Sequence, residues 1–69
     1  MAKTVGIDTG GTLTKLAYIN QDGELTVEVF PSNEMELVKE WLERHPQINE
    51  IGVTGGRTEQ LRKVLNPMT

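Results

Sequence analysis

A pair of adjacent glycines, Gly10 and Gly11, limits what this chain can fold into more than any other feature of its sequence. The stretch before the pair, Thr4–Asp8, is short and rich in strand-forming residues, and a second such stretch, Leu13–Asn20, follows it. Two strands joined by so short a glycine turn predict a β-hairpin. Because glycine tolerates positive φ, we expect the turn to use that conformation and to bring bare backbone N–H groups close to a ligand.

The polar residues around this turn are those that a phosphate site requires. Successive N–H groups in such a turn form a concave nest for an anion. Lys15 adds a positive charge, and three threonines add hydroxyl groups: Thr9, Thr12 and Thr14. Asp8 ends the first strand, where its carboxylate would repel a phosphate unless Mg²⁺ lay between them. The alternative is a plain tight turn with ordinary strand-forming threonines, but the two flanking charges favour a nucleotide–metal site.

A third strand completes an antiparallel meander. The turn Gln21–Glu24 contains Asp-Gly, which is among the strongest hairpin signals. The stretch Glu24–Phe30 alternates apolar and polar residues, as is typical of a strand with one face in solvent. Pro31 has no backbone N–H to donate to a sheet, so we expect the strand to end before it.

A helix is predicted over Asn33–His45, with Ser32 or Asn33 as its N-cap and Pro46 as its end. Its apolar residues recur at spacings of three and four and form one stripe: Met35, Val38, Trp41 and Leu42. We interpret Trp41 as a core residue, since aromatic residues at helical spacing usually pack. His45 is interpreted as a solvated residue that the helix dipole favours.

The remainder predicts a strand, a glycine turn and a second helix, which gives the order βββαβα. The strand, Ile48–Val53, follows a helix and should therefore pair in parallel through a right-handed crossover. After Thr54-Gly55-Gly56, the helix should run from about Arg57 or Thr58 to Leu65 and end at Asn66-Pro67. A glycine loop that opens a helix can bind an anion, or it can simply let the chain turn sharply. The sequence leaves both interpretations open.

Composition narrows the classes of function. At 69 residues, the chain is one small domain or part of one. Its net charge is −3 and its seven Lys and Arg residues are scattered, which argues against a nucleic-acid partner. No apolar run approaches the roughly 20 residues of a membrane span, so no membrane partner is expected. The sequence has no cysteine, which fits the reducing cytoplasm.

Two blocks of the sequence resemble a known family. The first resembles the first phosphate motif of the superfamily of acetate kinases, sugar kinases, heat-shock chaperones and actin: Asp8-x-Gly10-Gly11-Thr12-x-x-Lys15. The longer run from Val5 to Lys15 is similar to the start of type II pantothenate kinases. The second block, Ile51-Gly52-Val53-Thr54-Gly55-Gly56, is similar to the Thr-Gly-Gly segment of the same kinases. The order of the elements is similar too, so the resemblance covers nearly the whole chain.

The resemblance implies an α/β fold, a ribonuclease H-like half-domain within the truncated N-terminal ATPase-type domain of a kinase. It implies that the intact enzyme uses ATP and Mg²⁺ to phosphorylate the small molecule pantothenate in coenzyme A synthesis. Asp8 would orient the metal, and the residues implied for cofactor binding are Thr9, Gly10, Gly11, Thr12, Lys15, Gly55 and Gly56. The family's catalytic glutamate has no counterpart before Thr69, so the chain alone is expected to be inactive. The oligomeric state of the parent protein, a homodimer included, stays open.

Three alternatives have weight beside this hypothesis. Another kinase or an ATP-dependent dehydratase activator of the same superfamily would share the first block, but it would match the Thr-Gly-Gly block less well. The chain could instead be a non-catalytic half-domain that binds phosphate weakly or serves as a self-associating scaffold. A ribonuclease H-like nuclease ranks last, because two-metal catalysis needs several converging carboxylates and Asp8 alone lies at a strand end facing the turn.

Overall fold

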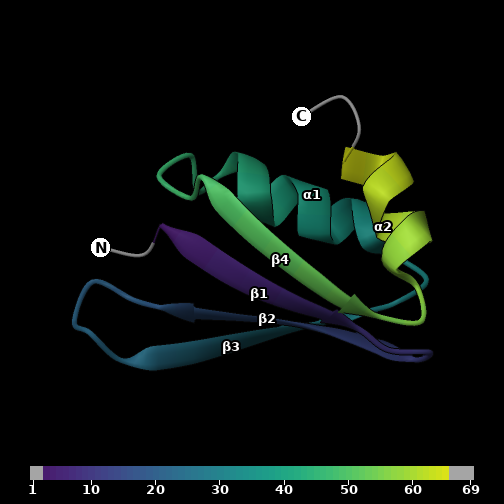
Figure 1. Ribbon diagram of the computed structural model, residues 1–69, viewed down its shortest axis with the longest axis horizontal. Helices are drawn as coiled ribbons and strands as arrows, with labels where there is room; N and C mark the ends of the chain where they lie inside the picture. Colours follow the sequence, from purple (N-terminus) through teal and green to yellow (C-terminus); the bar gives the residue numbers. More distant parts are fainter. Residues whose placement is uncertain (1–2, 66–69) are drawn as a thin grey trace.

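The computed structural model describes residues 3–65, and this part of the chain folds into one mixed sheet covered by two helices (Figure 1). The strand order is β3-β2-β1-β4, with antiparallel pairing of β1 to β2 and of β2 to β3, and parallel pairing of β1 to β4. This arrangement confirms the predicted βββαβα half-domain. The elements are β1 (Thr4–Thr9), β2 (Leu13–Ile19), β3 (Leu25–Pro31), α1 (Met35–Glu43), β4 (Glu50–Gly55) and α2 (Thr58–Leu65).

Both helices lie on the same side of the sheet and bury its inner face (Figure 1). Alternation along β1 sends Val5 and Ile7 toward the helices and leaves Gly6 and Asp8 exposed on the other face. The same alternation buries Leu16 of β2. The stripe predicted for α1 packs against these strands, together with α2, in one core: Val5, Ile7, Leu16, Met35, Val38, Trp41, Leu42, Leu61 and Leu65. Trp41 is therefore a core residue, as predicted.

Three aromatic rings pack together near the C-terminal end of α1. The ring of Tyr18 lies 5.1 Å from that of Trp41, and the ring of His45 stacks on Trp41 at 3.8 Å. The interpretation of His45 as a solvated residue was therefore incomplete, because its ring is half-buried against Trp41 and its Nδ1 lies 2.6 Å from the Trp41 carbonyl oxygen. Burial and the nearby Glu28 carboxylate raise the pKa of Tyr18.

The start of α1 differs from the prediction. The N-cap position is Glu34, and no side chain caps the helix by a hydrogen bond. Ser32 is instead fully buried and bonds to the β1–β2 turn. Strand β3 also continues through Pro31, one residue further than predicted. Because β3 is an edge strand, a proline there costs no ladder hydrogen bond on the open side.

The second turn of the meander forms as its Asp-Gly signal predicts. Gly23 has a φ of 81°, and the Asn20 side-chain carbonyl accepts hydrogen bonds from the N–H groups of Asp22 and Glu24. At the other end of the chain, α2 reaches Leu65, whereas the predicted stop at Asn66-Pro67 lies outside the described residues. Neither α1 nor α2, the helices between residues 3 and 65, is long and apolar enough to cross a membrane.

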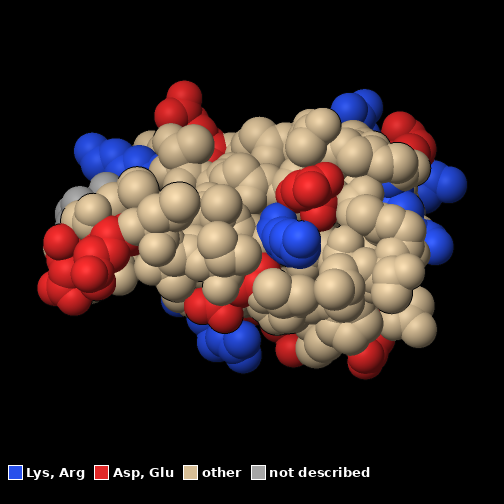
Figure 2. All heavy atoms as spheres, turned by 90° about the horizontal axis from the view of Figure 1, so that it is seen from below, with Lys and Arg blue, Asp and Glu red and all other residues tan. Residues whose placement is uncertain are grey.

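The outer face of the sheet carries no helix in the described part of the chain. Its exposed apolar side chains lie mainly on β3, at Leu25, Val27 and Val29. Figure 2 views the molecule from below and shows a largely uncharged surface with blue and red atoms close together near its middle. The charged residues that the sequence assigns to the site, Asp8 and Lys15, belong to this outer face.

Candidate functional site

The β1–β2 turn is tight, and its first glycine is required by the fold. The N–H group of Gly10 donates to the Leu13 carbonyl at 2.9 Å, so this N–H is already used within the hairpin. A Cβ atom at Gly10 would lie 2.6 Å from the same carbonyl oxygen. The expected positive φ is wrong for both Gly10 and Gly11, since the only glycines of residues 3–65 with positive φ are Gly23 and Gly55. The close approach of Leu13 explains Gly10 instead.

Gly11 and Thr12 form the exposed tip of this turn. A Cβ atom at Gly11 would meet nothing within 4 Å, so the fold itself gives no reason for glycine there. Within residues 3–65, the backbone N–H groups of Gly11 and Thr12 donate no hydrogen bond to the protein. These two groups, and not that of Gly10, are the N–H donors that an anion could use.

Asp8 and Lys15 lie directly opposite each other in the antiparallel pairing of β1 with β2. Both are exposed, and neither takes part in an ion pair within the described part of the chain. They help to line a shallow hollow of about 520 Å³ on the outer face. The hollow is lined by Gly6, Ile7, Asp8, Lys15, Ala17, Val27, Gly52, Val53 and Thr54. One carboxylate and one ammonium group are thus both open to a ligand.

The three threonines of the first block separate into two kinds. Thr9 and Thr14 are opposite each other on the inner face, and both are fully buried. The Thr9 hydroxyl donates to the Thr54 carbonyl at 2.9 Å and accepts from the Arg57 N–H at 3.1 Å. Only Thr12 is exposed at the tip of the turn. Strand alternation therefore commits the Thr9 and Thr14 side chains to contacts inside the protein.

The second glycine turn follows β4 and lies against the first. Parallel pairing sets Gly55 beside Thr9, so the two strands end at the same edge of the sheet. Gly55 has a φ of 107°, and a Cβ atom there would collide with the Thr9 carbonyl oxygen. Gly56 differs, because a Cβ atom there would meet nothing within 4 Å. The structure thus explains Gly55 by a sharp turn and leaves the space over Gly56 open.

Two residues that sequence reasoning did not assign to the site hold the first turn in place. The Ser32 hydroxyl donates to the Gly10 carbonyl at 2.7 Å, and its backbone N–H donates to the Thr12 carbonyl at 2.9 Å. The Arg57 Nε donates to the Gly11 carbonyl at 3.1 Å. No local pattern could have revealed these contacts, since Ser32 resembled a helix cap and Arg57 the first residue of a helix.

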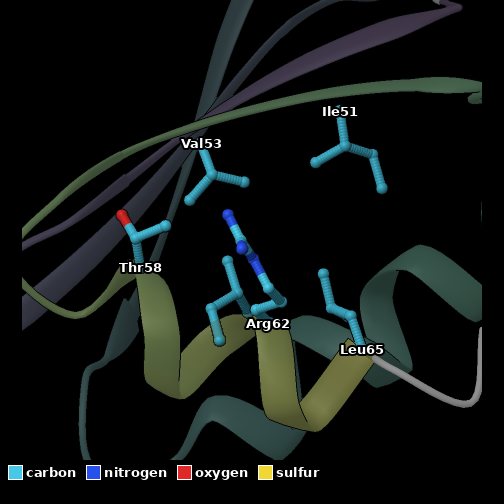
Figure 3. A pocket seen from close by; sticks show the side chains of 6 residues that line it. Ile51, Val53, Thr58, Arg62 and Leu65 are labelled. Carbon is cyan, nitrogen blue, oxygen red and sulfur yellow. The ribbon is translucent and has the colours of Figure 1, made fainter. Parts of the chain in front are cut away.

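A second hollow of about 300 Å³ lies between β4 and α2, away from Asp8 and Lys15 (Figure 3). Its walls are mainly apolar, and the Arg62 side chain reaches from α2 toward Val53 (Figure 3). It is lined by Ile51, Val53, Thr58, Leu61, Arg62 and Leu65. Neither hollow is a preformed all-protein metal centre, because residues 3–65 contain no group of three or more His, Cys, Asp or Glu side chains placed to hold an ion.

Comparison with known proteins gives close relatives of one kind. No family model matches the chain. It is 47% identical over 66 residues to the type II pantothenate kinase of Bacillus cereus strain AH820, a match that covers 96% of this chain and 24% of the relative. The type II pantothenate kinase of Bacillus anthracis is 44% identical over the same length. That of Oceanobacillus iheyensis is 37% identical over 59 residues, or 86% of this chain and 22% of the relative.

These matches bear out the resemblance seen in the two glycine blocks. The chain spans about a quarter of the length of the curated relatives that it matches. The match covers 96% of the chain in the relatives from Bacillus cereus strain AH820 and Bacillus anthracis, so it includes the elements between the blocks as well as the blocks themselves. Over nearly all of its length, the chain is homologous to part of the type II pantothenate kinases.

Proposed function

We propose that this chain is the part of an ATP-dependent pantothenate kinase that binds the phosphates of Mg-ATP, and that residues 1–69 belong to the N-terminal ATPase-type domain of that enzyme, of which they form a truncated part. One observation carries the proposal. Both glycine turns of the resemblance lie at the same end of the sheet, because Thr9 at the end of β1 pairs with Gly55 at the end of β4. The exposed Asp8 directly precedes Thr9, and the exposed Lys15 pairs with Asp8 on the neighbouring strand β2. The kinase would transfer the ATP γ-phosphoryl group to pantothenate in the cytoplasm.

Phosphoryl transfer asks a protein mainly for positioning and for neutralisation of charge. In the proposed site, the free N–H groups of Gly11 and Thr12 hold phosphate oxygens. Lys15 neutralises negative charge that builds up on the phosphates. Gly10 and Gly55 act indirectly by shaping the two turns, whereas Gly56 leaves room for a ligand beside the second turn. The Thr9 hydroxyl joins the turns from within.

The donor set at Asp8 suits Mg²⁺ that arrives with ATP. Mg²⁺ keeps several waters and often takes only one or two carboxylates from the protein, with the rest of its ligands from the substrate phosphates. Asp8 supplies one exposed carboxylate with no ion-pair partner in the described part of the chain. When bound, the metal would neutralise phosphate charge. Since Asp8 is assigned to it, the group that accepts the proton of the substrate hydroxyl is expected in the part of the relatives that this chain does not match.

A chimeric enzyme tests the proposal. The matched 66-residue segment of the Bacillus cereus kinase is replaced by the corresponding residues of this chain, and ATP-dependent formation of phosphopantothenate is measured. We expect activity comparable to that of the intact relative, and none from the 69-residue chain alone. A folded chimera that binds no Mg-ATP and forms no product would refute the proposed function.

A further inference from the structure

We propose that Ser32 and Arg57 are positioning residues that orient the peptide groups of the β1–β2 turn, so that the N–H groups of Gly11 and Thr12 stay directed away from these side chains and open to a bound polyphosphate. This inference rests on the proposed function. It adds an explanation of how the backbone of the β1–β2 turn is held in its binding conformation before the ligand arrives. Neither side chain needs to touch the ligand.

Arg57 fixes the direction of the Thr12 N–H. In a planar trans peptide, the carbonyl and the N–H that follows it point in opposite directions. The Arg57 Nε draws the Gly11 carbonyl toward itself at 3.1 Å, so the Thr12 N–H of the same peptide points away from Arg57. The arginine is itself held, since its Nη1 donates to the Gln60 side chain at 2.9 Å and its backbone N–H donates to the Thr9 hydroxyl.

Ser32 fixes the preceding peptide in the same way. Its hydroxyl donates to the Gly10 carbonyl at 2.7 Å, so the Gly11 N–H points away from Ser32. Ser32 is fully buried, and its hydroxyl also lies 2.9 Å from the Thr14 hydroxyl. Because the single Ser32 hydroxyl proton goes to Gly10, Thr14 is the donor in this second bond. The serine is thus locked in one orientation beneath the turn.

Both braces act from the helix-covered side of the sheet. Ser32 lies between β3 and α1 and bonds to the inward-facing Thr14, while Arg57 lies just before α2 and bonds to the inward-facing Thr9. They hold the turn from opposite flanks, because β3 and β4 are the two outermost strands of the sheet. Each brace therefore fixes the direction of one N–H group at the tip, which points away from the side chain that binds its peptide. Asp8 and Lys15 are exposed on the outer face of the strands that this turn joins.

Such bracing favours binding before any ligand arrives. Glycine loses more conformational freedom on ordering than any other residue, so an unbraced Gly-Gly turn would have to be ordered by the ligand. Groups held in their bound orientation reduce that entropic cost and raise affinity. The braces also join the two glycine turns, because Arg57 follows Gly56 in the chain and contacts Gly11 in space. The expected effect of losing a brace is weaker anion binding.

The test is a titration of the ¹⁵N-labelled 69-residue chain with Mg-ATP, and separately with inorganic tripolyphosphate, followed by NMR. We expect saturable shifts of the Gly11 and Thr12 amide signals in the unaltered chain. Arg57→Ala and Ser32→Ala should each weaken binding about five- to tenfold, the factor expected from the loss of one hydrogen bond. Without ligand, both variants should also lower the order parameters of the Gly11 and Thr12 amides.

A matched variant separates positioning from charge. Arg62→Ala removes the same charge from the exposed side of α2. This variant should leave affinity and turn order unchanged. Arg57→Lys keeps the charge but loses the directed Nε donor, so it should bind as weakly as Arg57→Ala. Full rescue by lysine would mean that Arg57 acts through its charge and would overturn its positioning role.

The remaining outcomes distinguish a failure of the proposed function from a failure of this inference alone. If the unaltered chain gives no saturable shifts with either probe, the phosphate site of the proposed function is wrong and the inference with it. If the unaltered chain binds and the folded Arg57→Ala and Ser32→Ala variants bind equally well, the inference alone is overturned. Because Ser32 is buried, Ser32→Ala could fail to fold. In that case Arg57→Ala alone tests the inference, since the bond that it removes, from the Arg57 side chain to Gly11, is exposed.

Discussion

The two glycine turns at the edge of the sheet are built alike in one respect and differently in another. In each pair, the first glycine is required by the fold, because a Cβ atom at Gly10 would clash with Leu13 and one at Gly55 would clash with Thr9. In each pair, a Cβ atom at the second glycine would meet nothing within 4 Å. The turns differ in backbone conformation, since only Gly55 has positive φ.

This comparison assigns different causes to neighbouring glycines. Gly10 and Gly55 are explained by atoms of the protein itself. Gly11 and Gly56 are not, and in the proposed function the space above them is left for the ligand. The comparison therefore predicts that the first glycine of each pair controls stability and that the second controls binding.

The largest effect is expected for Gly55→Ala. Alanine at positive φ is strained, and its Cβ would in addition meet the Thr9 carbonyl. A domain of this size has only about 3–5 kcal/mol of stability from its core, so this variant should be largely unfolded. Circular dichroism and urea unfolding of the chain measure the effect, with Gly56→Ala as the matched control, which should fold normally. Equal urea midpoints for the two variants would remove the distinction between first and second glycines.

A core variant shows how loss of stability alone affects the affinity for Mg-ATP. Leu42 lies on α1, is 4% exposed and packs in the hydrophobic core, so Leu42→Ala should cost about 2–5 kcal/mol. The chimeric kinase carrying this change should melt earlier, yet the part that stays folded should keep its affinity for Mg-ATP. If affinity instead falls in parallel with stability, binding cannot be used to separate the two kinds of glycine. The readouts are a thermal melt and a titration below the melting range.

Substitutions of Asp8 and Lys15 test whether the charged residues beside the first turn act in catalysis. In the chimeric kinase, Asp8→Asn and Lys15→Met should each lower kcat/KM about a hundredfold, the scale of one electrostatic stabiliser. Both residues are exposed, so stability should change by no more than about 0.5 kcal/mol. Steady-state kinetics and a melting curve on each variant test this. Near-normal activity of both would leave the turn as a plain hairpin.

The sequence predicted the elements well because they rest on local signals. Strand alternation identified the buried Val5 and Ile7, helical spacing identified the stripe with Leu42, and the glycine pair identified the first hairpin. The site was predicted less completely, because its supporting contacts join distant residues. Ser32 reaches Gly10 across 22 positions and Arg57 reaches Gly11 across 46, and no local pattern encodes either contact.

The conformations of the glycines were missed for a related reason. The presence of a glycine in the sequence shows that positive φ is possible there. It does not show whether positive φ or a close neighbouring atom is the reason that glycine is required. At Gly10 the requirement is the Leu13 carbonyl, and at Gly55 it is both positive φ and the Thr9 carbonyl. Likewise, the sequence could not show that the Thr9 hydroxyl is buried between two backbone groups.

The most direct test of this account is the variant Gly11→Val in the 69-residue chain, examined by urea unfolding and by NMR titration with Mg-ATP. Because a side chain at Gly11 meets open space and φ is not positive there, the urea midpoint should stay close to that of the unaltered chain. The added side chain should occupy the place of the phosphate, so the saturable amide shifts should disappear. A variant that unfolds early, or one that binds Mg-ATP as the unaltered chain does, would contradict the assignment of Gly11 to the ligand.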